Sequence, residues 1–320
     1  MAKRRARPKR LRVAPLVVVL TLLVGGATLL ILRLGMASPT QGDLTPAPTD
    51  TCRGVPAFTR ALGLGGALAL ATDQPQRGLV LRATDGSEAL YQHPTWGVAG
   101  YLGAIAYDGA GNVYAAPTPR LSLADNPLAG ATTLWRVDGA TGVMAPLVTL
   151  PGAATERNPF GVLGLTYTCT LDALYAGTVI GSTPTSERGG VVVIERSGHL
   201  RGVALAATDV LGVLVVRVGT GYTLYAGLAR SPQVVAVPLD ERGLAAGPGR
   251  PLLDLTAAGA APSERARKLR LSAGTLEVDL VPFNFSLQSN AAAQLQTRRA
   301  TWRYDGATDT WVVSQAAVGP

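Results

Sequence analysis

The chain has 320 residues, of which 47% are hydrophobic and 16% are charged, and these proportions exclude a largely disordered protein. The formal net charge is +8, but eight of the 29 basic residues lie in residues 1–34, which contain no acid. The remaining 21 basic residues match the 21 acidic residues, so the body of the chain lacks the excess positive charge typical of nucleic-acid binding. We therefore expect no nucleic-acid partner.

Residues 13–34 are predicted to form a transmembrane helix that attaches the protein to a bacterial cell membrane. Val13–Leu32 is an uncharged, mostly apolar stretch, and at ~1.5 Å per residue it would span the ~30 Å hydrocarbon core of a bilayer. Seven basic residues in 1–12 predict a cytoplasmic N-terminus, with the rest of the chain exported to the periplasm or the cell exterior. The alternative is a cleaved signal peptide that ends near Gly35-Met36-Ala37, although such apolar segments usually run ~7–15 residues.

Residues 35–56 are predicted to be a proline-rich linker that precedes a folded domain over 57–320. The chain has two cysteines, Cys52 and Cys169, and an exported protein is in a compartment that permits disulfides. One interpretation is a Cys52–Cys169 bridge that attaches the end of the linker to the domain. The other is a pair of free thiols, because two cysteines alone carry no geometric information.

Short strand-like runs recur along 57–315 as hairpins of two kinds, and Leu-Tyr-Ala-Gly occurs at both 174–177 and 224–227. The hairpins of the first kind span 104–116, 163–177 and 213–227. Those of the second kind span 77–94, 132–150, 189–206, 232–255 and 299–315. Turns such as WRVDGATG and WRYDGATD carry Asp-Gly, and we expect this glycine to take the positive-φ position.

One hairpin of each kind makes a four-stranded antiparallel unit of roughly 40–60 residues. Repeated units of this type predict an all-β fold, a β-propeller of four-stranded blades, because a ring of units buries faces that one unit leaves exposed. Five blades are visible in the sequence. A sixth would lie in 255–298, where 256–267 and 286–298 are predicted to be loops or insertions.

Two polar residues stand near the expected starts of inner strands. When the units are aligned on Gly103, Gly161 and Gly212, Asn158 and Asp209 each lie three residues before the shared glycine. They would then face one end of the central channel from neighbouring blades, and their oxygens suit Ca²⁺ or Mg²⁺. The alternative is an Asx turn at Asn158 and a strand cap at Asp209.

Other residues near these strand starts have a binding and a structural interpretation. Tyr101 and Phe160 are expected either to line a pocket or to pack between blades. Arg265, Arg267 and Lys268 give the last unit a local positive charge, and we expect them to lie in a solvated loop. The sequence contains no serine-hydrolase elbow, phosphate loop or zinc-type Cys/His cluster.

The repeats, with a glycine-led inner strand and a closing Leu-Tyr-Ala-Gly, resemble the senescence-marker-protein/gluconolactonase superfamily of calcium-dependent propellers, and more loosely NHL-type propellers, over most of 57–315. The resemblance implies a metal held by an Asn, an Asp and a Glu near the start of the propeller, and Asn158 and Asp209 match the first two in part. Residues 57–66 contain no acid, and Gly100 stands where the family often has a substrate-contacting Asn. With one carboxylate rather than two, a divalent ion would bind weakly.

These observations favour a membrane-anchored extracytoplasmic propeller that acts as a binding or interaction module for an unknown protein or small-molecule ligand. The first alternative is a hydrolase like those of the gluconolactonase family, which would open a lactone or ester with a divalent metal. The second alternative is a structural protein of the cell envelope.

Overall fold

The computed structural model describes residues 45–48, 54–62, 68–72, 77–83, 89–119, 127–287 and 297–319. The chain divides into two units, Met1–Thr40 and Gln41–Pro320, and every described residue belongs to the second. The predicted transmembrane segment 13–34 lies outside the described residues. No helix within the described ranges is long and apolar enough to cross a membrane.

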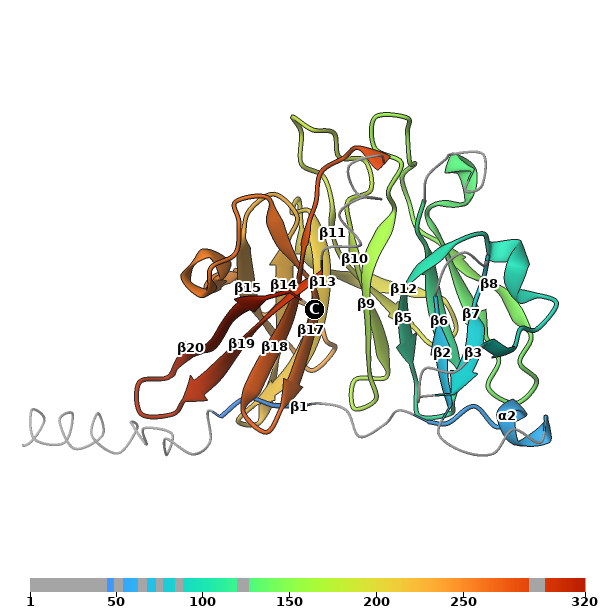
Figure 1. Ribbon diagram of the computed structural model, residues 1–320, viewed down its shortest axis with the longest axis horizontal. Helices are drawn as coiled ribbons and strands as arrows, with labels where there is room; N and C mark the ends of the chain where they lie inside the picture. The colour runs from blue at the N-terminus through green and yellow to red at the C-terminus, as the bar shows by residue number, and fades with distance from the viewer. Residues whose placement is uncertain are drawn as a thin grey trace, which may run out of the picture. The chain divides into compact units, whose positions relative to one another are not determined.

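In the described part of the chain the strands form five antiparallel sheets that follow one another in sequence (Figure 1). The first sheet has three strands: β2 (Leu68–Ala71), β3 (Val80–Ala83) and β4 (Ala89–Tyr91). The second and third have four strands each: β5 (Leu102–Tyr107), β6 (Val113–Pro117), β7 (Thr133–Val137) and β8 (Met144–Thr149), then β9 (Val162–Thr168), β10 (Ala173–Thr178), β11 (Gly190–Glu195) and β12 (Leu200–Ala206). The fourth and fifth contain β13 (Val210–Val218), β14 (Gly221–Leu228), β15 (Gln233–Leu239) and β16 (Arg250–Asp254), then β17 (Glu264–Ser272), β18 (Thr275–Pro282), β19 (Arg298–Asp305) and β20 (Thr310–Val318).

The remaining elements are short. Strand β1 (Ala47–Pro48) pairs with the end of β13 and adds a fifth strand to the fourth sheet. The helices are α2 (Phe58–Ala61), η2 (Trp96–Ala99), η3 (Leu128–Gly130) and η4 (Leu255–Ala258).

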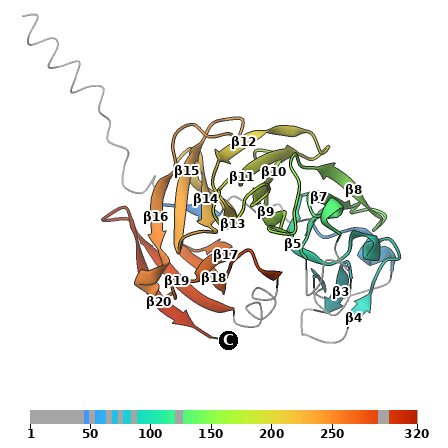
Figure 2. The ribbon, with the colours of Figure 1, turned by 90° about the horizontal axis from the view of Figure 1, so that it is seen from above.

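The apolar core lies between successive sheets. Separate clusters of buried residues join the first sheet to the second, the second to the third, the third to the fourth, and the fourth to the fifth. Between the second and third sheets, for example, the rings of Tyr114 and Tyr167 stack with their centroids 5.5 Å apart. Strands β5, β9, β13 and β17 contact one another in that order, and Figure 2 shows them facing the centre of the arc. We call these the inner strands, and the arrangement is consistent with a β-propeller.

The repeated Leu-Tyr-Ala-Gly marks a place where the next sheet approaches closely. A Cβ atom at Gly177 would lie 2.9 Å from Val210 of β13, and one at Gly227 would lie 2.6 Å from the carbonyl oxygen of Ala266 in β17. The three residues before each glycine are buried on both faces of their sheet. Glycine is therefore required at these two positions by packing rather than by backbone conformation.

The Asp-Gly turns form, but not in the predicted way. Gly139 does not have a positive φ; in that turn the positive φ belongs to Gly142. Asp138 organises the turn instead, because its Oδ1 accepts hydrogen bonds from the backbone N–H groups of Ala140 and Thr141. The aspartate is the residue on which this turn depends, as in other Asx turns.

The segment predicted to contain a sixth unit or insertions holds the first half of the fifth sheet. Strands β17 and β18 lie within 255–298, and β19 and β20 complete the same sheet. The prediction of a loop over 256–267 is therefore wrong from Glu264 onwards.

The last part of the predicted linker is attached to the sheets. Beyond the pairing of β1 with β13, the backbone N–H of Gly54 donates to the carbonyl oxygen of Asp108, and the Phe58 ring packs against Gly142. Cys169 lies in the turn between β9 and β10 and is disulfide-bonded. Cys52, the other cysteine of the chain, lies outside the described residues, so the Cys52–Cys169 pairing stays a prediction.

Tryptic mapping tests this pairing. Without reduction, we expect residues 34–53 and 158–188 to be recovered as one cross-linked peptide, because trypsin cuts after Arg33, Arg53, Arg157 and Arg188. Reduction should release both peptides, as seen by mass spectrometry. Recovery of a free, alkylated 34–53 peptide without reduction would contradict the prediction.

Candidate functional site

A central pocket of about 220 Å³ lies at the end of the inner strands where their chains begin, and we call it the central pocket throughout. All five sheets contribute to it: Thr72 follows β2, Gly103 is in β5, Leu163 in β9, Leu211 in β13 and Arg267 in β17. The volume is that of roughly seven waters at ~30 Å³ each. This is smaller than the ~300–1,000 Å³ typical of sites for drug-sized ligands, so the pocket suits a smaller molecule.

A β-bulge near the start of each inner strand forms the wall of the central pocket. In β9, Leu163 is the extra residue between the paired positions Val162 and Gly164, and in β13 Leu211 is the extra residue between Val210 and Gly212. The bulge of β17 leaves Arg267 in the same relation to its neighbours, and β5 has a bulge that includes Gly103. A bulge turns a side chain out of the regular alternation of its strand, and here it turns equivalent residues towards the pocket.

Arg267 therefore places a cation in the central pocket, at the bulge position that Leu163 occupies in β9 and Leu211 in β13. Its side chain has no hydrogen bond or ion pair with any described residue. Burial lowers the pKa of Arg267 to about 10, so the guanidinium remains charged at neutral pH. No carboxylate is present among the described residues that line the pocket.

Thr118 adds a second polar group without a partner. Its side chain is 5% exposed, and its Oγ1 makes no hydrogen bond with any residue that the structure describes. A Cβ atom built on Gly103 would lie 1.9 Å from Thr118 Oγ1 and 3.3 Å from Arg267 Nη2. The Thr118 side chain therefore fills the space that a Cβ would take at Gly103, and the guanidinium of Arg267 lies on the same side of this glycine.

The other basic residues near the start of β17 lie in that strand, so the prediction of a loop is wrong, although Lys268 is exposed. Arg265 is buried and donates to four backbone carbonyl oxygens, including that of Ala229 at 2.9 Å. Lys268 lines the central pocket beside Arg267. Burial, together with the charge of Arg267, lowers the pKa of the Lys268 ammonium.

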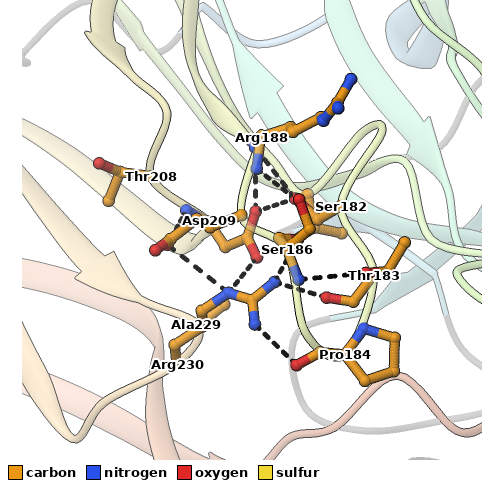
Figure 3. A network of polar contacts seen from close by, with 12 residues as sticks. Ser182, Thr183, Pro184, Ser186, Arg188, Thr208, Asp209, Ala229 and Arg230 are labelled. Atoms are coloured by element: carbon orange, nitrogen blue, oxygen red, sulfur yellow. Dashed lines mark hydrogen bonds and ion pairs between the residues drawn. The ribbon is translucent and has the colours of Figure 1, made fainter.

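Asn158 and Asp209 are brought together through Ser182. The Nδ2 of Asn158 donates to the carbonyl oxygens of Ser182 (3.0 Å) and Val179 (2.6 Å), and the hydroxyl of Ser182 donates to Asp209 Oδ1. The same Asp209 oxygen accepts from the backbone N–H of Gly189. We call Asn158, Ser182, Gly189, Asp209 and Arg230 the Asp209 network, of which Figure 3 labels Ser182, Asp209 and Arg230.

Arg230 occupies the second oxygen of Asp209. Its Nε donates to Asp209 Oδ2 at 2.7 Å, and its two terminal nitrogens donate to the carbonyl oxygens of Thr183, Pro184 and Ser186 (Figure 3). Asp209 is fully buried. The pair therefore ties β13 to the loop that joins β10 and β11.

The donor set of Asn158 and Asp209 does not fit a calcium ion. Asn158 Oδ1 accepts from the backbone N–H of Phe160, and both oxygens of Asp209 are engaged by protein donors, one of them cationic. Among the described residues, no group of three or more histidine, cysteine, aspartate and glutamate side chains is placed to hold a metal. Both residues have structural partners, which agrees with the interpretation of Asn158 as an Asx-type residue.

The alignment that paired Asn158 with Asp209 is wrong in register. Gly212 lies opposite Gly227 and Gly164 lies opposite Gly177, so the counterpart of Gly212 is Gly164 rather than Gly161. The two polar residues therefore do not occupy equivalent positions, although their side chains belong to one network.

The two aromatic residues of the predicted pocket lie in different surroundings. Phe160 lines the central pocket and contacts Phe283, with ring centroids 5.5 Å apart. Tyr101 is not among the lining residues; it forms an isolated bridge with Gly78, and its carbonyl oxygen accepts from the backbone N–H of Thr118.

The sequence did not predict that Arg267 and Thr118 lie together in one pocket. A signal for Arg267 was present, because VLG recurs at 162–164 and 210–212 while ARK stands at 266–268, which places a cation in a leucine position. Nothing local distinguishes Thr118 from other threonines, because its surroundings depend on contacts between strands.

No protein-family model matches the chain, and no curated protein matches its sequence. Several solved structures resemble the chain at low sequence identity. Regucalcin from Agrobacterium tumefaciens, a calcium-binding protein, is 15% identical over 85% of this chain and 78% of its own, with a TM-score of 0.45. Hydrazine synthase from Kuenenia stuttgartiensis is 10% identical over 89% and 69%, with a TM-score of 0.47, and an endo-arabinase from Bacteroides thetaiotaomicron is 11% identical over 65% and 77%, with a TM-score of 0.40. At these values the likenesses carry no argument about activity.

Replacement of Asp209 tests the structural role of its network. In the full chain in detergent, Asp209→Ala should lower the free energy of unfolding by about 3 kcal/mol, because it leaves the Gly189 N–H and the Ser182 hydroxyl without their acceptor and Arg230 with only the more distant Glu187 carboxylate, 3.8 Å away. Urea unfolding with and without added calcium measures this, and Glu241→Ala, at an exposed position, is the matched control. Calcium-dependent stabilisation that is present in the wild type and absent in Asp209→Ala would contradict this account.

Proposed function

We propose that this protein is an exported, membrane-anchored β-propeller that binds a small molecule in its central pocket. The observation that supports it is the pocket itself, which is lined by residues of all five described sheets. Its walls combine apolar side chains, such as Phe160, Leu163 and Leu211, with a few polar groups. This combination is typical of small-molecule sites, in which apolar contacts contribute affinity and the polar groups orient the ligand.

The membrane attachment in this proposal rests on the sequence. The apolar stretch Val13–Leu32 has the length of a bilayer span, and the basic residues before it favour a cytoplasmic N-terminus. The disulfide at Cys169 agrees with an oxidising compartment outside the cytoplasm.

A binding role accounts for the pocket better than hydrolysis does. The described polar side chains that line it are three threonines, Arg267 and Lys268, with neither a carboxylate nor a histidine to act as a general base. Hydrolysis through a metal at Asn158 and Asp209 would require the Asp209 network to be taken apart. A purely structural role in the envelope would not explain why the pocket combines apolar walls with a few polar groups.

Binding is tested by saturation-transfer NMR, with the full chain in detergent and a set of small aromatic and aliphatic compounds. Phe283→Ala should weaken binding about tenfold, because it removes an apolar wall of the central pocket. Phe285→Ala is the matched control, since Phe285 contacts Phe283 but lines a neighbouring surface pocket instead.

Two results would contradict the proposal. One is the absence of any bound compound; the other is equal weakening by Phe283→Ala and Phe285→Ala, which would place binding outside the central pocket.

A further inference from the structure

The four bulges of the inner strands provide an internal comparison for Arg267. Equivalent positions hold Gly103, Leu163 and Leu211, all of which are compatible with an apolar channel. The fifth sheet places arginine there instead. The fold therefore accommodates leucine at the bulge position of an inner strand and does not require a cation there.

Elsewhere at this end of the sheets, buried charges have partners. Asp209 is paired with Arg230, and Glu264, at the start of β17, accepts from Arg298 at 2.8 Å. Asp279, opposite Lys268 in the fifth sheet, accepts from Arg270 and Arg299. Of the described residues, none is positioned to neutralise Arg267.

Arg267 is partly buried, and a guanidinium held away from bulk water without an ion pair among the described residues is stabilised by a ligand of opposite charge. Beside it, Thr118 Oγ1 is buried without a hydrogen-bond partner. Both groups can donate, both line the central pocket, and both lie on the same side of Gly103. A ligand atom that accepts hydrogen bonds and carries negative charge would satisfy both.

We propose that the ligand of the central pocket is a small organic carboxylate, held by Arg267 and Thr118 through its oxygens and by Leu163, Leu211 and Phe160 through an apolar body. This proposal rests on the binding role proposed above. The planar fork of a guanidinium matches a carboxylate in a bidentate arrangement. The apolar walls favour a carboxylate with a hydrocarbon body over inorganic phosphate, which would leave them unfilled.

The experiment compares benzoate with its neutral analogue benzamide by NMR titration of the full chain in detergent, with inorganic phosphate as an anion that lacks an apolar body. Benzoate should bind more tightly than either. Arg267→Leu, which introduces the residue of the equivalent positions, should weaken benzoate binding by on the order of tenfold or more and weaken benzamide binding much less, because the neutral amide loses a hydrogen bond but no ion pair. Arg267→Lys should retain part of the benzoate affinity because it keeps the charge.

Two further variants separate the site from general effects. Arg217→Leu removes a positive charge from an exposed position of inner strand β13 and should leave benzoate binding unchanged. Thr118→Val keeps the shape of the side chain and removes the hydroxyl, so benzoate affinity should fall by several-fold while the fold is retained. Urea unfolding should show that Arg267→Leu is at least as stable as the wild type.

The outcomes distinguish the two proposals. Equal binding of benzoate and benzamide, with no effect of Arg267→Leu, would overturn the carboxylate proposal and keep the binding role of the pocket. Tightest binding of phosphate would also overturn it, in favour of an inorganic anion. Failure of every probe, benzamide included, together with failure of the wider compound set, would overturn both.

Discussion

The structure depends on the burial of sheets that are apolar on both faces. An antiparallel sheet such as β9–β12 cannot hide both faces by itself, and here each sheet packs against the next through a separate apolar core. Close packing requires a small residue where one sheet contacts the inner strand of the next. Gly177 of β10, against β13, and Gly227 of β14, against β17, meet this need.

The buried polar groups at and near the central pocket fall into two classes. The first class holds loops and strands together: Asp209 joins Arg230 and Ser182, and each of its oxygens is engaged. The second class, Arg267 and Thr118, lacks partners among the described residues and faces the central pocket. Asp209 is thus already satisfied by the protein, whereas Arg267 and Thr118 line the pocket and are not, which is why we assign structure to the first class and binding to the second.

Much of the fold was predictable, because it is encoded locally and repeated. The hairpins over 104–116, 163–177 and 213–227 correspond to β5–β6, β9–β10 and β13–β14, since alternating apolar residues and polar turns are visible in any one repeat. The start of β17 was missed because two of its buried residues there, Glu264 and Arg265, are charged, so the apolar alternation begins only with Leu269 and Leu271. The site was less predictable. The contact of Asp209 with Arg230 and the isolation of Thr118 depend on neighbours distant in sequence, and a shift of three residues in aligning the repeats paired Asn158 with the wrong position.

The central claim is that Arg267 binds a negatively charged ligand in the central pocket. Crystallography of the protein soaked with 4-bromobenzoate tests it most directly, because the anomalous signal of bromine locates the ligand independently of the protein density. The account predicts a bromine peak among the apolar walls, with the carboxylate in contact with Arg267 and Thr118. A pocket without bromine, in which Arg267 forms an ion pair with a carboxylate of the protein, would contradict it.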